Sequence, residues 1–590
     1  MPYYRLGSVL AALALTACAQ PAVAPADADA APSTSTATKE DALPERSVQK
    51  LDGPLLYELL VGEMSAAQGD AQTAVSLLLD AARQTQSEAL YRRATDIALR
   101  ARSGPRALQA ANAWQQDFPD SRDANRYLLQ ILLMLNRVSE SEQPLARELA
   151  ATPLASKPAV YLGIAQLYRH VSDKKLAAAV VEQALQADLH EPATRPNALT
   201  LLGHLQLMAG QKAQALDTAQ QAHALAPDNG ATALLALELL ENQLPEAEAM
   251  VRGYLAREAA PTIRLAYARA LIDQQRLEDA RTELEAVVAH APDQGDAWYI
   301  LGAVYAQLGQ WEQAEQALQA YLPLIERIPE AAQRRHALQQ ASTLGARSAL
   351  QANNLPRAEQ WLQRVQGQNE LLSLQSLRAA VLAKQGKLAQ ARALIRATPS
   401  GSPTEDRRKQ QAEVQLLRDA KAYQEAFALQ SRLQQAHPED PDITYETALL
   451  AERVGQLDTM EALLRSVMAR HPDYHHAYNA LGYSLADRGV RLDEARALIQ
   501  TALDQAPNDP FITDSLGWVA FRQGNLQEAL TLLEKAYTLR DDVEIATHLG
   551  EVLWVQGERE RALSLWRQAL QRDPDNEVLR ATLQRLQVQP

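Results

Sequence analysis

Apolar side chains recur every three or four positions from residue 55 almost to the end of the chain, which is the pattern of helices with one buried face. The stretch WYILGAVYAQLGQWEQAEQALQAYLP, which starts at Trp298, shows how two such helices would meet. Its first half reads W-x2-L-G-x2-Y with Gly302 as the small residue, and Ala314 follows twelve positions later in the second half. Helices approach closely where the facing side chains are small, so this spacing predicts two antiparallel helices that cross at Gly302 and Ala314.

The same pair of small residues recurs along the chain, in most cases twelve positions apart. Further pairs are Gly62/Ala74, Gly203/Ala215, Ala268/Ala280, Ala346/Ala358, Ala379/Ala391, Gly482/Ala495, Gly517/Ala529 and Gly550/Ala562. Near the C-terminus the pairs repeat with a period of about 34 residues, which together with the W-x2-L-G-x2-Y motif is the signature of the tetratricopeptide repeat (TPR). We therefore predict an all-α fold, a TPR superhelical solenoid of antiparallel helix pairs with a C-terminal capping helix.

The repeat is clearest in an N-terminal array, residues 51–330, and in a C-terminal array, residues 373–574. Between the arrays, residues 331–372 match the pattern poorly and form a degenerate repeat region. The whole stretch has room for about 15 helical pairs. Residues 575–590 contain a final amphipathic helix with Leu579 and Leu583 on one face, as a capping helix requires.

Residues 1–17 have the layout of a secretory signal peptide, with Arg5 before the short apolar run VLAALALTA. The run ends in Leu-Thr-Ala-Cys18, which resembles the bacterial lipoprotein box. This resemblance implies cleavage before Cys18, the only cysteine in the chain, and acylation of that residue. Ala19, in place of Asp, implies by the same resemblance export to the outer membrane. The alternative is a plain secretory signal followed by an incidental cysteine.

Residues 18–50 are rich in Ala, Pro, Ser, Thr and Asp and lack apolar periodicity, so we expect a flexible tether after the lipidated Cys18. Beyond residue 17 no apolar stretch approaches the ~20 residues of a membrane span. The formal net charge of -14 disfavours nucleic acid as a partner. We therefore expect a protein that is held at the outer membrane by its acyl chains and faces the periplasm.

Reactive side chains do not converge on a catalytic pattern. Ser484 in GYSLA half-matches a nucleophile elbow, but that motif needs a strand-to-helix turn and Ser484 lies within a predicted helix. The only histidine cluster, His471, His475 and His476, is divided by Pro472 between two predicted helices, which disfavours a metal site. The sequence contains no nucleotide-binding glycine loop. We therefore predict a protein that is not an enzyme and has no cofactor and no bound metal.

The first helix of each pair lines the concave face of a TPR solenoid, so its inward positions are candidate contacts for a partner. Near the C-terminus these positions hold large aromatic residues and one acid: Tyr483, Phe511, Asp514, Trp518, Phe521 and Trp554. Large aromatics on a groove suit the anchoring of a partner's peptide or helix. The alternative is that they fill the space between helices.

A second set of inward positions is basic. It consists of Arg92, Arg126, Arg169, Arg269, Arg347 and Arg418. These arginines could receive acidic groups of a partner, although arginines that are solvated or paired within the chain are the simpler interpretation. No repeat combines Lys at its fifth position with Asn at its ninth, so the carboxylate clamp of chaperone-binding TPR domains is absent.

Two segments, residues 56–101 and 479–525, together with the lipoprotein box resemble the family of large proteobacterial outer-membrane TPR lipoproteins that includes the LbcA adaptor. The first begins LYELLVGEMSAAQGD and the second begins NALGYSLADRGVRLDEA. The resemblance implies a scaffold that binds a periplasmic carboxyl-terminal processing protease and its substrates, hydrolases that cut peptidoglycan cross-links. The alternative is a lipoprotein that assists assembly of secretin, pilus or exopolysaccharide machinery, or that activates a peptidoglycan synthase.

Overall fold

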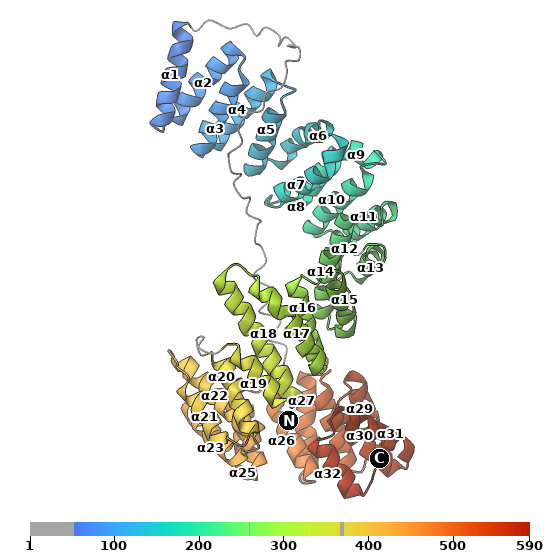
Figure 1. The fold of residues 1–590 in the computed structure, drawn as a ribbon. Helices are drawn as coiled ribbons and strands as arrows, with labels where there is room; N and C mark the ends of the chain where they lie inside the picture. The colour runs from blue at the N-terminus through green and yellow to red at the C-terminus, as the bar shows by residue number, and fades with distance from the viewer. Residues whose placement is uncertain (1–51, 259, 366–370) are drawn as a thin grey trace. The chain divides into compact units, whose positions relative to one another are not determined.

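The computed structural model describes residues 52–258, 260–365 and 371–590 (Figure 1). The predicted signal peptide, Cys18 and the tether to residue 50 lie outside these residues. Within the described ranges the chain forms 32 α-helices and no strand, which confirms the predicted all-α TPR solenoid. The chain divides into two compact units, Met1–Ala151 and Thr152–Pro590, so the division falls inside the predicted N-terminal array.

The helices of unit 1 are two TPR-like pairs followed by a less regular segment. They are α1 (Gly53–Ala67), α2 (Ala71–Thr85), α3 (Glu88–Arg100), α4 (Gly104–Asp117), α5 (Arg122–Met134) and α6 (Glu142–Ala150). Asp70 begins α2, because its carboxylate accepts a hydrogen bond from the amide N–H of Thr73 at 3.2 Å. Tyr91 and Trp114 are fully buried and fill the core between α3 and α4.

The first part of unit 2 continues the pattern of consecutive antiparallel helices. It contains α7 (Lys157–Tyr168), α8 (Lys174–Ala184), α9 (Gln186–His190), α10 (Arg195–Met208), α11 (Lys212–Leu225), α12 (Gly230–Glu241), α13 (Glu248–Leu255), α14 (Pro261–Asp273), α15 (Leu277–His290), α16 (Gly295–Gln307) and α17 (Trp311–Glu326). The first helices of successive pairs, α7, α10, α12 and α14, also pack directly on one another. This layer of first helices carries the candidate sites described below.

The remainder of unit 2 runs to the C-terminus. It contains α18 (Ala331–Gln351), α19 (Leu355–Gln363), α20 (Leu372–Lys384), α21 (Leu388–Ala397), α22 (Pro403–Asp419), α23 (Tyr423–Ala436), α24 (Pro441–Arg453), α25 (Leu457–Arg470), α26 (His475–Asp487), α27 (Leu492–Gln505), α28 (Pro510–Arg522), α29 (Leu526–Leu539), α30 (Val543–Gln556), α31 (Arg559–Arg572) and α32 (Glu577–Leu586). Asp509 begins α28 by accepting the N–H groups of Phe511 and Ile512 at 2.8 and 3.0 Å. Pro510 then occupies the first turn, where its missing N–H costs nothing.

The crossing points predicted from the small residues are observed. A Cβ atom added to Gly482 in α26 would lie 2.5 Å from Cγ1 of Ile499 and 2.9 Å from the carbonyl oxygen of Ala495, both in α27. At Gly302 in α16 the nearest atom, Cγ of Leu318 in α17, would be 3.1 Å away. A larger residue would therefore push the paired helices apart, which explains the choice of glycine.

The degenerate region at 331–372 is a helix pair with altered dimensions. Helix α18 has 21 residues, and its crossing with α19 places Gly345 against Trp361. An added Cβ at Gly345 would lie 2.5 Å from the indole of Trp361, which is buried. The length of α18 and the buried indole account for the poor match to the repeat pattern.

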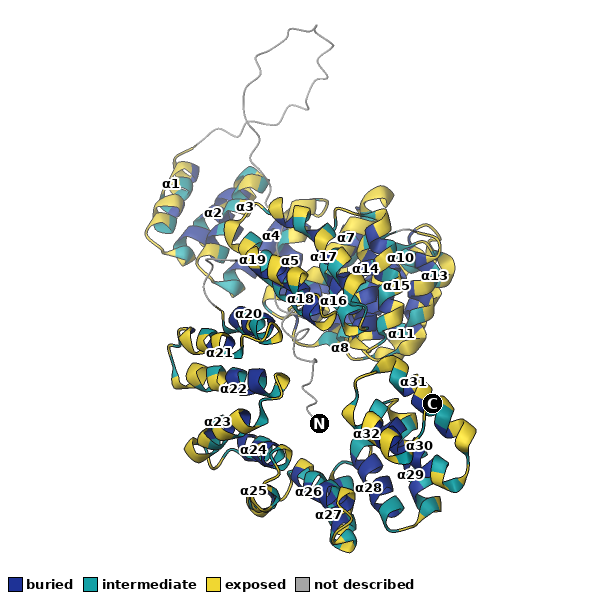
Figure 2. Cartoon of the chain, turned by 60° about the horizontal axis from the view of Figure 1, so that its bottom comes forward, coloured by how far each residue is buried: buried dark blue, intermediate teal, exposed yellow. Residues whose placement is uncertain are grey.

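The last helix, α32, covers the end of the array as predicted. Leu579 and Leu583 are buried and Leu586 packs on the same cluster, which also contains Trp566 of α31. Figure 2 shows the result along the chain: single helices carry a buried stripe on one side and an exposed stripe on the other. The apolar face of each helix pair is thus buried by the neighbouring pairs, as expected of a solenoid.

Candidate partner-binding surfaces

The predicted aromatic set lies on α26, α28 and α30, but two of its members are covered by the chain itself. Trp518 and Asp514 are only 4% and 2% exposed. Tyr483, Phe511, Phe521 and Trp554 are half-buried. In this conformation Trp518 and Asp514 present almost no surface to a partner, which favours the alternative that these two fill the space between helices.

A histidine that sequence analysis did not single out explains the burial of Trp518. The ring of His548 in α30 stacks on the indole of Trp518, with the centroids 4.4 Å apart. Its Nδ1 lies 2.9 Å from Oδ2 of Asp514, and its Nε2 lies 3.4 Å from the hydroxyl of Tyr483. Asp514 and His548 are 34 residues apart, which is one repeat, so a search for complementary side chains at that spacing would have found the pair.

Electrostatics around His548 favour its charged form. Burial lowers the pKa of His548, but the negative charge and the hydrogen bond of Asp514 more than compensate, so that its pKa is raised above the ordinary value. Burial also raises the pKa of Glu544, one turn earlier on α30. The inner layer of the C-terminal array therefore contains a buried network that includes an acid, a histidine and aromatic rings.

The other aromatic residues of the set also contact the chain. Phe521 packs beside Trp518 with ring centroids 5.2 Å apart. The indole of Trp554 lies 5.8 Å from that of Trp566, and the guanidinium of Arg540 lies 5.2 Å from the ring of Phe511. The binding role of the half-buried members remains a prediction.

The basic set separates into paired and unpaired arginines. Four pair with an acid on a following helix: Arg92 with Asp123, Arg126 with Glu148, Arg269 with Asp296 and Arg418 with Glu446. Among the residues that the structure describes, Arg169 and Arg347 have no acidic partner. Pairing within the chain, the simpler interpretation of the sequence, therefore applies to four of the six.

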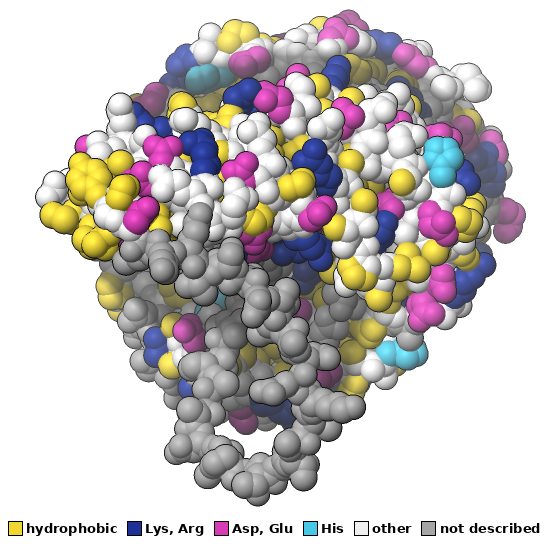
Figure 3. Space-filling model, turned by 90° about the horizontal axis from the view of Figure 1, so that it is seen from above, with side chains coloured by type: hydrophobic (Ala, Val, Ile, Leu, Met, Phe, Trp, Pro, Cys, Tyr) yellow, Lys and Arg dark blue, Asp and Glu magenta, His cyan; other side chains and the backbone are white. Residues whose placement is uncertain are grey.

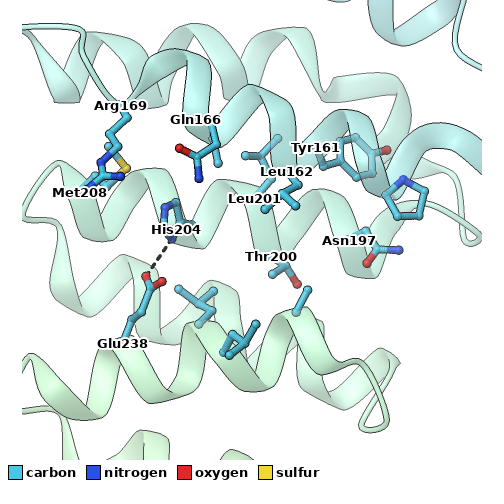
Figure 4. Close-up of a pocket in the computed structure, with 15 residues that line it drawn as sticks. Tyr161, Leu162, Gln166, Arg169, Asn197, Thr200, Leu201, His204, Met208 and Glu238 are labelled. Carbon is cyan, nitrogen blue, oxygen red and sulfur yellow. Dashed lines mark ion pairs between the residues drawn. The ribbon is translucent and has the colours of Figure 1, made fainter. Parts of the chain in front are cut away.

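A hollow of about 480 Å³ lies between the first helices α7, α10 and α12 (Figure 4). Arg169 and Met208 lie at one end and Tyr161 and Asn197 at the other, with leucine side chains between them. Nδ1 of His204, from α10, lies 2.8 Å from Oε2 of Glu238, from α12. The hydrogen bond with Glu238 raises the pKa of His204, an effect that burial and the charge of Arg169 only partly offset.

Helix α1 presents a second apolar surface, in unit 1. Four of its large apolar side chains are exposed although the helix packs against α2: Leu56, Tyr57, Leu60 and Met64. Figure 3 shows such hydrophobic side chains gathered together on the surface of the chain. An exposed apolar group of this kind is typical of an interaction surface.

The structure also places the residues that were considered for catalysis or metal binding. Ser484 lies inside α26 and is buried, so it has no nucleophile-elbow geometry. His475 and His476 begin α26, whereas His471 follows α25. Within the described ranges there is no group of three or more His, Cys, Asp or Glu side chains that could hold a metal ion. None of the helices in the described part of the chain combines the length and apolar character needed to cross a bilayer.

Comparison with known proteins identifies the repeats. The tetratricopeptide repeat family matches residues 265–332, 372–397, 445–510 and 520–586. The TPR repeat-containing protein PA4667 of Pseudomonas aeruginosa is 40% identical over 184 residues, which is 31% of this chain and 31% of that protein. Cellulose synthase operon protein C of Xanthomonas axonopodis pv. citri is 28% identical over 408 residues, which is 63% of this chain and 26% of that protein. The aligned part is thus less than a third of either relative.

Solved structures with similar helices include other repeat proteins. TTC0263, a TPR protein of Thermus thermophilus, aligns with a TM-score of 0.29 and 23% identity over 31% of this chain and 100% of that one. The Cut9–Hcn1 hetero-tetramer of the APC/C aligns with a TM-score of 0.27 and 15% identity over 91% of this chain and 96% of that one. The repeat period, the crossing helix pairs and the family matches thus identify tetratricopeptide repeats in this chain, and these repeats indicate a scaffold for protein–protein interaction.

Proposed function

We propose that the chain is a non-enzymatic scaffold that is anchored in the outer membrane through acyl chains on Cys18 and binds periplasmic proteins. Its proposed partners are a carboxyl-terminal processing protease and the peptidoglycan hydrolases that this protease degrades. The observation that carries the proposal is the combination of a lipoprotein box at Cys18 with helical repeats that extend from Gly53 to Leu586. The lipoprotein family that the sequence resembles supplies the identity of the partners.

The physical advantage of such a scaffold is a raised local concentration. When a protease and its substrate are bound to one chain, their second encounter becomes intramolecular, with an effective concentration of about millimolar for short flexible connections. The chain offers distinct surfaces for two partners, since the exposed face of α1 lies in unit 1 and the hollow between α7, α10 and α12 lies in unit 2. The scaffold would thus raise the rate at which its partners encounter one another and would supply no catalytic side chain of its own.

Affinity capture tests the identity of the partners. The tagged full chain is expressed in its own host, solubilised from envelopes in mild detergent and captured. A carboxyl-terminal processing protease and at least one peptidoglycan hydrolase are expected among the captured proteins. Repeated captures that lack the protease while retaining other envelope proteins would refute the protease link.

Membrane fractionation tests the anchor separately. A Cys18→Ser variant should leave the outer-membrane fraction and appear in the soluble periplasmic fraction, because the serine at position 18 cannot carry the acyl chains. A variant that stays in the outer membrane after a salt wash would exclude lipid anchoring through Cys18.

A second function is favoured by one comparison. The similarity to cellulose synthase operon protein C extends over 63% of this chain. The name of that relative refers to the synthesis of cellulose, an exopolysaccharide. On this alternative the chain assists an exopolysaccharide machine. Capture distinguishes the two functions, because the captured proteins would then be synthase or export components rather than a protease.

A further inference from the structure

The hollow between α7, α10 and α12 exposes apolar side chains that the chain itself does not cover. Leu162 of α7 is 68% exposed and Leu234 of α12 is 47% exposed, and both line the hollow. Most of the other large leucines on these helices are buried in the array. Two exposed leucines that face one concave space are typical of a binding groove rather than of scattered surface residues.

One charged side chain of the same hollow has no partner of opposite charge. Glu238 contacts His204 at 2.8 Å, whereas Arg169 has no acidic partner among the residues that the structure describes. Inward arginines of this chain are more often paired, since four of them form an ion pair with an acid from a following helix. Arg169 is therefore a cation left available beside apolar surface.

We propose that this hollow binds a segment of a partner protein in which a large apolar side chain is close to an aspartate or glutamate. The apolar side chain occupies the middle of the hollow, against Leu162 and Leu234. The carboxylate pairs with the guanidinium of Arg169, which can donate two parallel hydrogen bonds to it. The proposal rests on the scaffold role but not on the identity of the protease or its substrates.

The dimensions of the hollow limit the spacing of the two groups in the partner. Arg169 stands at one end of the hollow, and Leu162 lies about two turns, or ~10 Å, earlier on α7, so an extended partner segment reaches both with residues about three positions apart (Figure 4). The volume of about 480 Å³ suits a few side chains, not a folded domain. Because the exposed side chains of Leu162, Leu234 and Arg169 all line this hollow, we expect a segment that lies along it, so that the carboxylate comes from a side chain and not from a chain end.

Selection from a random dodecapeptide library tests the proposal. The peptides are displayed with their C-terminal ends fused to a linker, which removes the free terminal carboxylate, and are selected on the full chain in detergent. The enriched sequences should place Leu, Ile, Phe or Met within about three positions of Asp or Glu. An amidated synthetic copy is then titrated against the variants by fluorescence anisotropy.

Matched substitutions separate the hollow from the general surface. Arg169→Gln should weaken binding of the synthetic peptide at least about tenfold, because a charge-assisted pair is lost. The double variant Leu162→Ser/Leu234→Ser should weaken it by a similar factor. Arg408→Gln and Leu225→Ser, which alter exposed residues outside the hollow, should leave binding within about twofold of the original.

The proposal is overturned if no peptide is enriched over background, or if the enriched peptides bind the Arg169→Gln variant with unchanged affinity. It is also overturned if binding requires a free terminal carboxylate. Circular dichroism of each variant checks that the repeats stay folded, which is expected because the altered side chains are exposed. A negative selection would leave the capture of a protease possible, and a failed capture would leave peptide selection intact, so that the two proposals fail separately.

Discussion

The imidazole of His548 and the carboxylate of Asp514 meet at 2.9 Å in the buried layer of first helices of the C-terminal array. The two residues lie on α30 and α28, one repeat apart, so their contact links neighbouring repeats. Removing one member of such a buried pair is costly, because the remaining group stays desolvated without its partner. The pair is thus a specific polar connection between two neighbouring repeats, in a layer that also buries Thr513, Thr547 and Glu551.

The substitution Asp514→Asn should destabilise the C-terminal repeats by about 3–5 kcal/mol, since it removes the main counter-charge of the buried His548. Urea unfolding followed by tryptophan fluorescence measures the change, because Trp518 stacks on His548. Glu534→Gln, which breaks the exposed pair with Arg561, serves as control and should cost less than about 1 kcal/mol. Equal losses for the two variants would contradict a structural role for the buried pair.

Stability of the C-terminal array should depend on pH through His548. Its pKa is raised in the folded protein, so its contribution is fully present below the ordinary value of 6.5 and is lost as pH rises through the raised pKa. Glu544 acts in the same direction at lower pH, because burial raises its pKa above 4.5. The difference in urea midpoint between the original chain and His548→Gln should therefore shrink from pH 6 to pH 9. A difference that is constant or grows over this range would exclude a charged His548 in the fold.

The crossing glycines should tolerate no side chain. Gly482→Ala is expected to destabilise the chain by about 1–3 kcal/mol, because the new methyl group would meet the backbone oxygen of Ala495 at 2.9 Å. Gly163 is the matched control: it also lies within a helix, but nothing stands within 4 Å of an added Cβ. Gly163→Ala should be neutral or stabilise by about 0.5–1 kcal/mol, since alanine favours the helix. Thermal melts of both variants, recorded by circular dichroism, decide the point.

The contrast between these sites shows what a repeat sequence predicts well. The crossings at Gly302 and Gly482 could be predicted because they depend on sterics between two helices that are close in the sequence. The burial of Trp518 could not, because it depends on how closely successive first helices approach, which is set by small rotations accumulated between repeats.

Contacts between repeats were only partly accessible from the sequence. The pairing of Arg92 with Asp123 and of His204 with Glu238 joins residues about one repeat apart, so a comparison at that spacing would have indicated it. No pattern in the sequence indicates the exposure of Leu162, since this exposure depends on the lack of a side chain that covers it in the folded chain. The hollow was therefore found only in the structure.

The aromatic residues of the C-terminal array can be assigned to core or to binding surface by two substitutions. Trp518→Ala should cost about 3–5 kcal/mol, because the indole is buried and stacked on His548, and partner binding should fall together with stability. Phe521 is only half-buried and lies at the edge of the same cluster, so Phe521→Ala should cost clearly less stability. Urea unfolding of each variant, alongside binding of whichever envelope protein is captured, separates the effects. If Phe521→Ala lowers affinity while the unfolding midpoint is nearly unchanged, Phe521 belongs to a binding surface; a parallel loss of both would place it in the core with Trp518.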